Sequence, residues 1–166
     1  MRDAIAAAIA LVLLLFAASL ATTLHFYRKR RLRARDAEGE RGRTIVAEIP
    51  TEDDLVLFSE GAECFYYGAR SIDKDRIAAV RVLINGSPIA SYVSSRAAPQ
   101  AAAQATSFDD RPEGIARDRW DVAIESVGGV VLVECGAIRE RVSQELARAV
   151  FDAVKRDIEL RDTVSI

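Results

Sequence analysis

The sequence predicts an α+β protein: one N-terminal transmembrane helix, then a small antiparallel β-sheet or barrel of about seven strands, packed by a C-terminal amphipathic helix. Three observations predict this class. The chain begins with an uninterrupted apolar run, continues with short β-branched and aromatic runs separated by turn residues, and ends with apolar residues at steps of three and four. Of the 166 residues, about 120 remain for a single soluble domain, which is an ordinary domain size.

The apolar run extends from Ala4 to Tyr27 and contains 24 residues without Asp, Glu, Lys or Arg. As a helix it would be about 36 Å long, slightly more than the roughly 30 Å hydrocarbon core of a bilayer. His25, Phe26 and Tyr27 stand at its end, where amphipathic rings prefer the headgroup level. Residues 1–27 are therefore expected to form a transmembrane signal anchor.

Six cations within eight residues follow the apolar run, whereas its other end has a single Arg beside an Asp. The six are Arg28, Lys29, Arg30, Arg31, Arg33 and Arg35. This bias predicts an N-terminus outside and a cytoplasmic soluble domain, held at the cell inner (cytoplasmic) membrane. Residues 28–43 are expected to be a basic juxtamembrane linker, and its mixed-charge, glycine-containing part, residues 36–43, is expected to be solvated.

Two alternatives stay open for this region. A cleaved signal peptide would also have an apolar core, and Ser19-Leu20-Ala21 places small residues before a cut at Thr22. The dense cationic run after that point opposes translocation, which favours the anchor. The six cations either orient the helix or, in addition, hold anionic lipid at about 1 kcal/mol each.

The net charge changes sign along the chain. Residues 28–43 carry eight basic and three acidic side chains, a net charge of +5, whereas residues 44–166 carry 14 basic and 21 acidic ones, a net charge of −7. Because proteins bind nucleic acid largely by neutralising phosphates, the acidic domain argues against a nucleic-acid partner. The expected partners are the lipid bilayer and another protein.

Residues 44–166 are expected to be a soluble β-rich domain because short apolar runs rich in Val, Ile, Phe and Tyr alternate there with turn residues. The expected strands are Thr44–Ile49, Asp54–Ser59, Ala62–Tyr67, Arg76–Ile84, Pro88–Val93, Arg119–Val127 and Val130–Cys135. Asn85-Gly86 and Gly128-Gly129 predict tight hairpins, since these residues accept positive φ.

Alternation in the strand around Trp120 predicts which of its faces is buried. Trp120, Val122 and Ile124 share one face, which is expected to lie in the core. The intervening positions, Asp121, Ala123 and Glu125, are expected to face water. Trp120 is accordingly interpreted as a core residue and not as a binding residue.

The C-terminal segment, about Arg139 to Arg161, is expected to be a helix that docks on the sheet. Its apolar stripe consists of Val142, Leu146, Ala149, Val150, Ala153, Val154 and Ile158. Residues 94–113 are rich in Ala, Gln and Ser, contain two prolines and lack an apolar face, which predicts a long, disordered loop.

The sequence contains few candidate catalytic residues. His25 is the only histidine and lies at the membrane boundary, so the soluble domain has no residue for a Ser-His-Asp triad or a histidine zinc site. Cys64 and Cys135 lie in predicted strands and are interpreted as small buried hydrophobes. The acidic groups Glu52-Asp53-Asp54, Asp73 with Asp75, and Asp109-Asp110 fall in predicted turns and are interpreted as solvated charges. No catalytic, cofactor or metal residue is assigned, and the domain is expected to be non-enzymatic.

Several strand segments and the helix after them resemble the bacterial pleckstrin-homology-like domains. The segments are Leu55-Val-Leu-Phe-Ser59, Arg76-Ile-Ala-Ala-Val-Arg-Val-Leu-Ile84 and Val130-Val-Leu-Val-Glu-Cys135. The resemblance is architectural and covers residues 44–161. It implies a bent antiparallel barrel with the helix plugging one end, and a membrane-attached scaffold or adaptor role. The long Ala-rich loop departs from a compact member of this family.

The resemblance does not assign a phosphoinositide site, because a fold does not fix a function. The nearest basic residues in the domain are Arg70, Lys74 and Arg76, and the acids Asp73 and Asp75 interrupt them. The expected function is a non-enzymatic interaction or scaffold module on the membrane. The alternative is a module that contacts anionic lipid through the basic juxtamembrane segment.

Overall fold

The computed structural model describes residues 2–51, 55–96 and 119–164. The chain divides into two compact units, Met1–Arg41 and Gly42–Ile166. Most of the predicted loop 94–113 lies outside the described residues, as do the acidic groups Glu52-Asp53-Asp54 and Asp109-Asp110.

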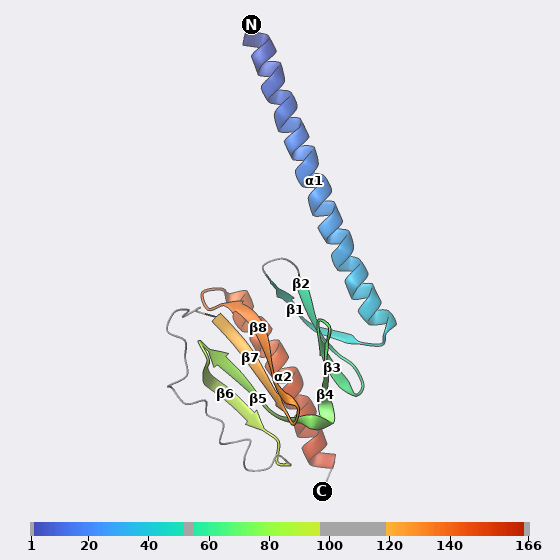
Figure 1. Ribbon diagram of the computed structural model, residues 1–166, viewed down its shortest axis with the longest axis vertical. Coiled ribbons are helices and arrows are strands. Elements are labelled where there is room, and N and C mark those ends of the chain that lie inside the picture. Colours follow the sequence, from blue (N-terminus) through green and yellow to red (C-terminus); the bar gives the residue numbers. More distant parts are fainter. Residues whose placement is uncertain (1, 52–54, 97–118, 165–166) are drawn as a thin grey trace. The chain divides into compact units, whose positions relative to one another are not determined.

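The first unit is a single helix, α1, that extends from Arg2 to Glu40 (Figure 1). Among the described residues, α1 is the one helix that is long and apolar enough to cross a membrane. Helix continues through residues 28–40 of the predicted basic linker, including residues 36–40 of the part expected to be solvated, because Arg, Leu, Ala and Glu in this stretch are good helix formers. Gly42 follows with φ +68°, a left-handed conformation that ends many helices.

The second unit contains two four-stranded sheets, joined by a short 3₁₀ helix, η1 (Lys74–Arg76). The first sheet has the order β1-β2-β3-β4, with β1 Thr44–Pro50, β2 Leu55–Glu60, β3 Cys64–Tyr67 and β4 Arg70–Asp73. The second has the order β6-β5-β7-β8, with β5 Ile77–Ile84, β6 Ser87–Val93, β7 Arg119–Ser126 and β8 Gly129–Ala137. All neighbouring strands are antiparallel.

The predicted α+β class is confirmed, but the predicted single sheet or barrel of seven strands is wrong. The structure has two separate sheets and no closed barrel among the described residues. The strand that the sequence did not indicate is β4, whose residues Arg-Ser-Ile-Asp contain one apolar side chain and therefore no alternation to recognise. Arg76, expected in a strand, belongs to η1.

Both predicted hairpins are present. Asn85 and Gly86 have φ values of 51° and 77°, as a tight turn between β5 and β6 requires. The second turn is displaced by one residue from the prediction: Gly129, with φ 127°, already pairs with Ser126, so Val127 and Gly128 form its tip.

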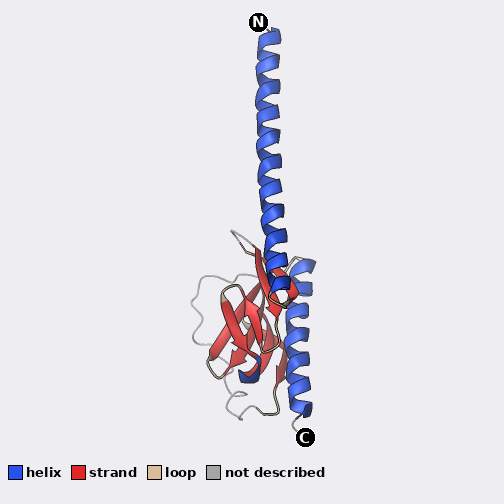
Figure 2. Ribbon diagram, turned by 90° about the vertical axis from the view of Figure 1, so that its right-hand side faces the viewer, coloured by secondary structure: helices blue, strands red, loops and turns tan. Residues whose placement is uncertain are grey.

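Helix α2 (Arg141–Val164) packs against β1, β5, β7 and β8, and β1 also contacts β8 (Figures 1 and 2). Phe58 and Phe65 are the largest fully buried side chains of the core, and their rings stack with centroids 5.6 Å apart. From α2, the predicted stripe residues Val150, Val154 and Ile158 are fully buried.

Two predictions about burial need correction. Val142, expected in the helix stripe, is 61% exposed, and Ser143 and Ala147 are buried in its place. Asp121 and Ala123, expected to face water, are also buried. Ala123 is a small residue between two longer register partners, Arg81 on β5 and Leu132 on β8, and such neighbours cover it.

Candidate functional site

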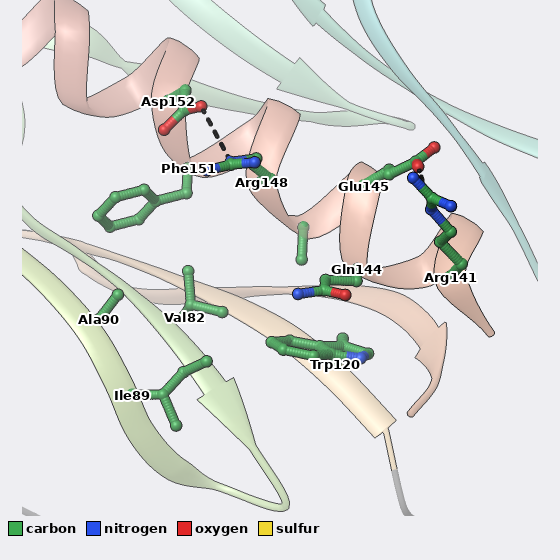
Figure 3. Close-up of a pocket in the computed structure, with 11 residues that line it drawn as sticks. Val82, Ile89, Ala90, Trp120, Arg141, Gln144, Glu145, Arg148, Phe151 and Asp152 are labelled. Carbon is green, nitrogen blue, oxygen red and sulfur yellow. Dashed lines mark hydrogen bonds and ion pairs between the residues drawn. The ribbon is translucent and has the colours of Figure 1, made fainter. Parts of the chain in front are cut away.

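The second unit contains a groove of about 440 Å³ between α2 and the second sheet. Figure 3 shows α2 above and the strands below, with Val82 between Phe151 and Trp120. The groove is lined by Val82, Ile89, Ala90, Trp120, Arg141, Gln144, Glu145, Ala147, Arg148, Phe151 and Asp152. Its floor is apolar, and its charged residues all come from α2.

The floor owes its shape to an irregularity in β6. Val82 pairs with Ala90 and Leu83 with Pro88, so Ile89 is an extra residue, a β-bulge. Neighbouring residues of a regular strand point to opposite faces, whereas a bulge redirects a side chain. The bulge explains why Ile89 and Ala90 both line the groove, and why Ile89 is 54% exposed.

Trp120 was interpreted as a core residue, and in the structure it also has a second role. Its indole packs against the core cluster while also lining the groove. Its buried Nε1–H has no hydrogen-bond acceptor among the described residues. A buried donor without an acceptor costs about 1–3 kcal/mol, so the apolar contacts of the indole hold it in place against this cost.

The rim of the groove consists of two ion pairs on α2, each between residues four apart. Arg141 Nε lies 3.1 Å from Glu145 Oε1, and Arg148 Nε lies 4.0 Å from Asp152 Oδ2 (Figure 3). All four side chains are more than 60% exposed. Exposed pairs of this kind contribute little to stability, so the rim can exchange its partners at small cost.

The other end of α2 is held by a set of partly buried charges, the Lys74 cluster, which comprises Lys74, Glu60, Asp157 and Arg161. Lys74 Nζ lies 2.8 Å from Glu60 Oε1 and 3.3 Å from Asp157 Oδ1. Arg161 Nε lies 2.9 Å from Asp157 Oδ2. Lys74 also lies over the Phe65 ring, 4.8 Å from its centroid. The cluster joins β2, η1 and the last turns of α2.

Asp162 fixes the end of β6 to the same part of α2. It accepts hydrogen bonds from the Ser94 hydroxyl, 2.7 Å away, and from the Ser95 N–H, 2.9 Å away. Burial raises the pKa of Asp162, but these hydrogen bonds and the nearby charge of Arg96 outweigh burial, so the pKa lies below its usual value.

Cys135 does not have the environment of a nucleophile. Cys135 is fully buried, and burial, followed by the charge of Asp121, raises the pKa of its thiol to about 12. It is therefore a neutral thiol near neutral pH. Cys64 is only partly buried, whereas the sequence predicted burial, and both thiols are free.

The residues that the sequence singled out do not gather into one site. The six cations of the basic run lie on α1 and are exposed. In the domain, Lys74 belongs to the Lys74 cluster, which removes it from any phosphate site with Arg70 and Arg76. Asp73 caps η1 by accepting the Asp75 N–H at 3.0 Å. Within the described part of the chain, no group of three His, Cys, Asp or Glu side chains is placed to hold a metal ion.

The groove itself was not predicted. Its two walls, β6 and the first half of α2, are separated by about fifty residues of sequence and do not share a motif. Only Pro88 and the apolar Ile89 next to it, in a strand whose residues are otherwise small or polar up to Tyr92, signalled an unusual edge. Comparison of the chain with protein-family models, with curated proteins and with solved structures returns no match.

Proposed function

We propose that this chain is a single-pass membrane protein whose residues 44–166 form a non-enzymatic interaction module. The observation that carries the proposal is the groove: an apolar hollow whose rim charges are exposed and satisfied by each other. Its apolar floor and charged rim match the apolar centre and polar rim of surfaces that bind other proteins. The groove holds neither cysteine, and the only histidine of the sequence is in α1.

The proposed location follows from α1 and its charges. The apolar part of α1 spans the inner (cytoplasmic) membrane, with the N-terminus outside and the module in the cytoplasm, because the cations follow the apolar run. For the module we propose a pleckstrin-homology-like architecture. Two antiparallel sheets covered by a C-terminal helix support this assignment.

Alkaline carbonate extraction and protease protection test the location. We expect the chain to stay in the membrane fraction, and residues 44–166 to be digested in inside-out vesicles but protected in right-side-out ones. Release of a soluble domain by carbonate, or the opposite protection pattern, would contradict the anchor or its orientation.

Photo-cross-linking in cells tests the interaction. A photoreactive residue is placed at Ala90 in the groove, at Val130 on the β7–β8 hairpin or at Val142 on α2, all of which are exposed. The proposal expects a discrete cross-linked protein from at least one position. Cross-links to lipid alone from every position would contradict a protein-binding role.

Anionic-lipid contact is the second candidate function, and the continuity of α1 favours it. Successive residues of a helix are rotated by about 100°, so the six cations surround the helix axis and form a collar suited to headgroups on all sides. We expect the purified protein to retain more anionic lipid than a variant with Gln at all six positions. Equal retention would leave the cations with an orienting role only.

A further inference from the structure

We propose that the groove binds an amphipathic α-helix of a partner protein, presented through an apolar stripe about three turns long. This inference rests on the proposed function, because it names the kind of partner that the interaction module binds. Three observations carry it: the length of the groove along α2, the interrupted edge of β6, and the spacing of the rim charges.

The groove follows one side of α2 from Arg141 to Asp152. Eleven helical steps correspond to about 16 Å, or three turns. Ala147, a small buried residue of α2, leaves room between the larger side chains at the two ends, Trp120 and Phe151. The hollow is thus long enough for side chains from three successive turns, and at about 440 Å³ it has room for side chains but not for a whole helix.

The edge of β6 disfavours an extended peptide as the occupant. A strand that joins a sheet needs a regular row of backbone donors and acceptors. Pro88 has no N–H, and the bulge at Ile89 breaks the row beside the groove. An extended peptide would bring backbone groups without partners into an apolar groove, at about 1–3 kcal/mol each. A helix satisfies its own backbone and offers only side chains.

The rim charges repeat at the spacing of a helix. Arg141, Glu145, Arg148 and Asp152 alternate in sign at steps of three or four residues and have no net charge. A partner helix with charges of alternating sign beside its apolar stripe can pair with them one by one. A uniformly anionic ligand, such as a lipid headgroup, gains from two rim residues what it loses to the other two, and the acidic domain opposes it further.

Trp120 makes the proposal directly testable because it is the only tryptophan of the chain and lines the groove. The full chain is placed in phosphatidylcholine nanodiscs and used to select binders from a displayed library of tryptophan-free peptides with 15 randomised positions. The selected peptides are then titrated against the protein while Trp120 fluorescence is followed. We expect binders with apolar residues at steps of three and four, and a saturable change in Trp120 emission.

Two matched variants locate the binding. Ala90→Arg introduces a long cation into the groove at an exposed position, and Leu160→Arg introduces the same side chain at a position on α2 that is 62% exposed and does not line the groove. We expect Ala90→Arg to weaken peptide binding at least tenfold and Leu160→Arg to leave it within twofold. Equal urea midpoints for the two variants exclude unfolding as the cause.

Several outcomes would overturn the proposal. These are apolar residues at every second position of the binders, equal binding by the two variants, or selection of no binder at all. Emission of Trp120 that changes with protein concentration would identify a second copy as the occupant, and a change on introducing anionic lipid into the nanodisc would identify lipid. Binders that are insensitive to Ala90→Arg would reject the groove but leave the interaction module standing, whereas cross-links to lipid alone would reject both.

Discussion

The two halves of α2 are held in different ways. The second half is fixed by the Lys74 cluster and by Asp162, whose side chains are largely buried. The first half carries Arg141–Glu145 and Arg148–Asp152, whose side chains are 62–90% exposed. The C-terminal end of α2 is therefore fixed to the rest of the domain, whereas its N-terminal end forms one wall of the groove.

The difference follows from where each charge meets solvent. Removing one partner of a buried ion pair leaves an uncompensated charge in a poorly solvated place, which costs about 3–5 kcal/mol. Exposed pairs contribute about 0–1 kcal/mol because water solvates the partner that remains. Similar residue types thus stabilise the fold at one end of α2, whereas at the other end they can change partners at little cost.

The largest expected effect tests this contrast directly. Lys74→Met keeps the apolar stem over Phe65 but removes the cation that Glu60 and Asp157 share, which leaves Asp157 with Arg161 at 2.9 Å and Glu60 with Arg156 at 3.8 Å. We therefore expect a loss of about 3 kcal/mol in the free energy of unfolding, at the lower end for a broken buried pair. The matched change Arg148→Met removes a cation from an exposed pair and should cost less than about 0.5 kcal/mol. Urea unfolding of the full chain in detergent micelles, followed by Trp120 fluorescence, measures both. Similar losses for the two variants would remove the distinction between the halves.

The next effect concerns how the first half of α2 is positioned. Gly136 has φ +115°, and a Cβ built there would lie 2.6 Å from Ser143 Oγ on α2. Gly136→Ala should therefore cost about 2 kcal/mol from the strained backbone and the contact. Gly128→Ala is the control, since a Cβ built at Gly128 would have its nearest neighbouring atoms 3.9 Å away. Adding Ser143→Ala should recover part of the loss in Gly136→Ala, and no recovery would show that the contact is unimportant.

A smaller effect is expected at Asp162, and it depends on pH. The folded pKa of Asp162 lies below the unfolded value, so its contribution to stability is present above the unfolded pKa of about 3.9 and is lost as the pH falls through the folded pKa. We expect Asp162→Asn to lose about 1 kcal/mol near neutral pH and to match the parent protein in strong acid. Urea midpoints of the two proteins over a pH series measure this. A difference that stays constant with pH would contradict the assignment.

Asp121 should give the smallest effect and the opposite sign. Burial, only partly offset by Arg119, raises the pKa of Asp121, so its ionisation becomes unfavourable to the fold as the pH rises from the unfolded pKa through the folded one. Asn at this position can still accept the 2.9 Å hydrogen bond from Arg119 Nε. Asp121→Asn is therefore expected to be slightly more stable than the parent near neutral pH, measured in the same pH series. Destabilisation would mean that the ion pair outweighs burial.

The sequence predicted the elements that depend on local patterns. The apolar run, the Asn85-Gly86 hairpin and the C-terminal helix each follow from residues close together in the chain. It did not predict β4, which has no alternation, or the division into two sheets, which depends on pairings between strands. The sequence also predicted an exposed Asp121 and a buried Val142, and both predictions were wrong because tertiary neighbours decide burial.

The candidate site was harder to predict than the fold. Alternation placed Trp120 on the core face, and it does pack there, but the groove beside it arises from a bulge in β6 and from small Ala147 on α2. A bulge is a mismatch between two strands and is visible only when their register is known. No pattern within either segment could have indicated that they face each other.

The interrupted edge of β6 has a consequence beyond the groove. Regular exposed strand edges promote association between copies of a chain. Under the proposed anchoring, copies diffuse in a plane and meet one another repeatedly in similar orientations, which makes edge-to-edge polymerisation a greater hazard than it is in free solution. Because Pro88 lacks a donor and Ile89 bulges out of register, β6 is a poor template for this growth. The irregularity that opens the groove thus also makes this edge of the sheet unsuited to pairing with a neighbouring molecule.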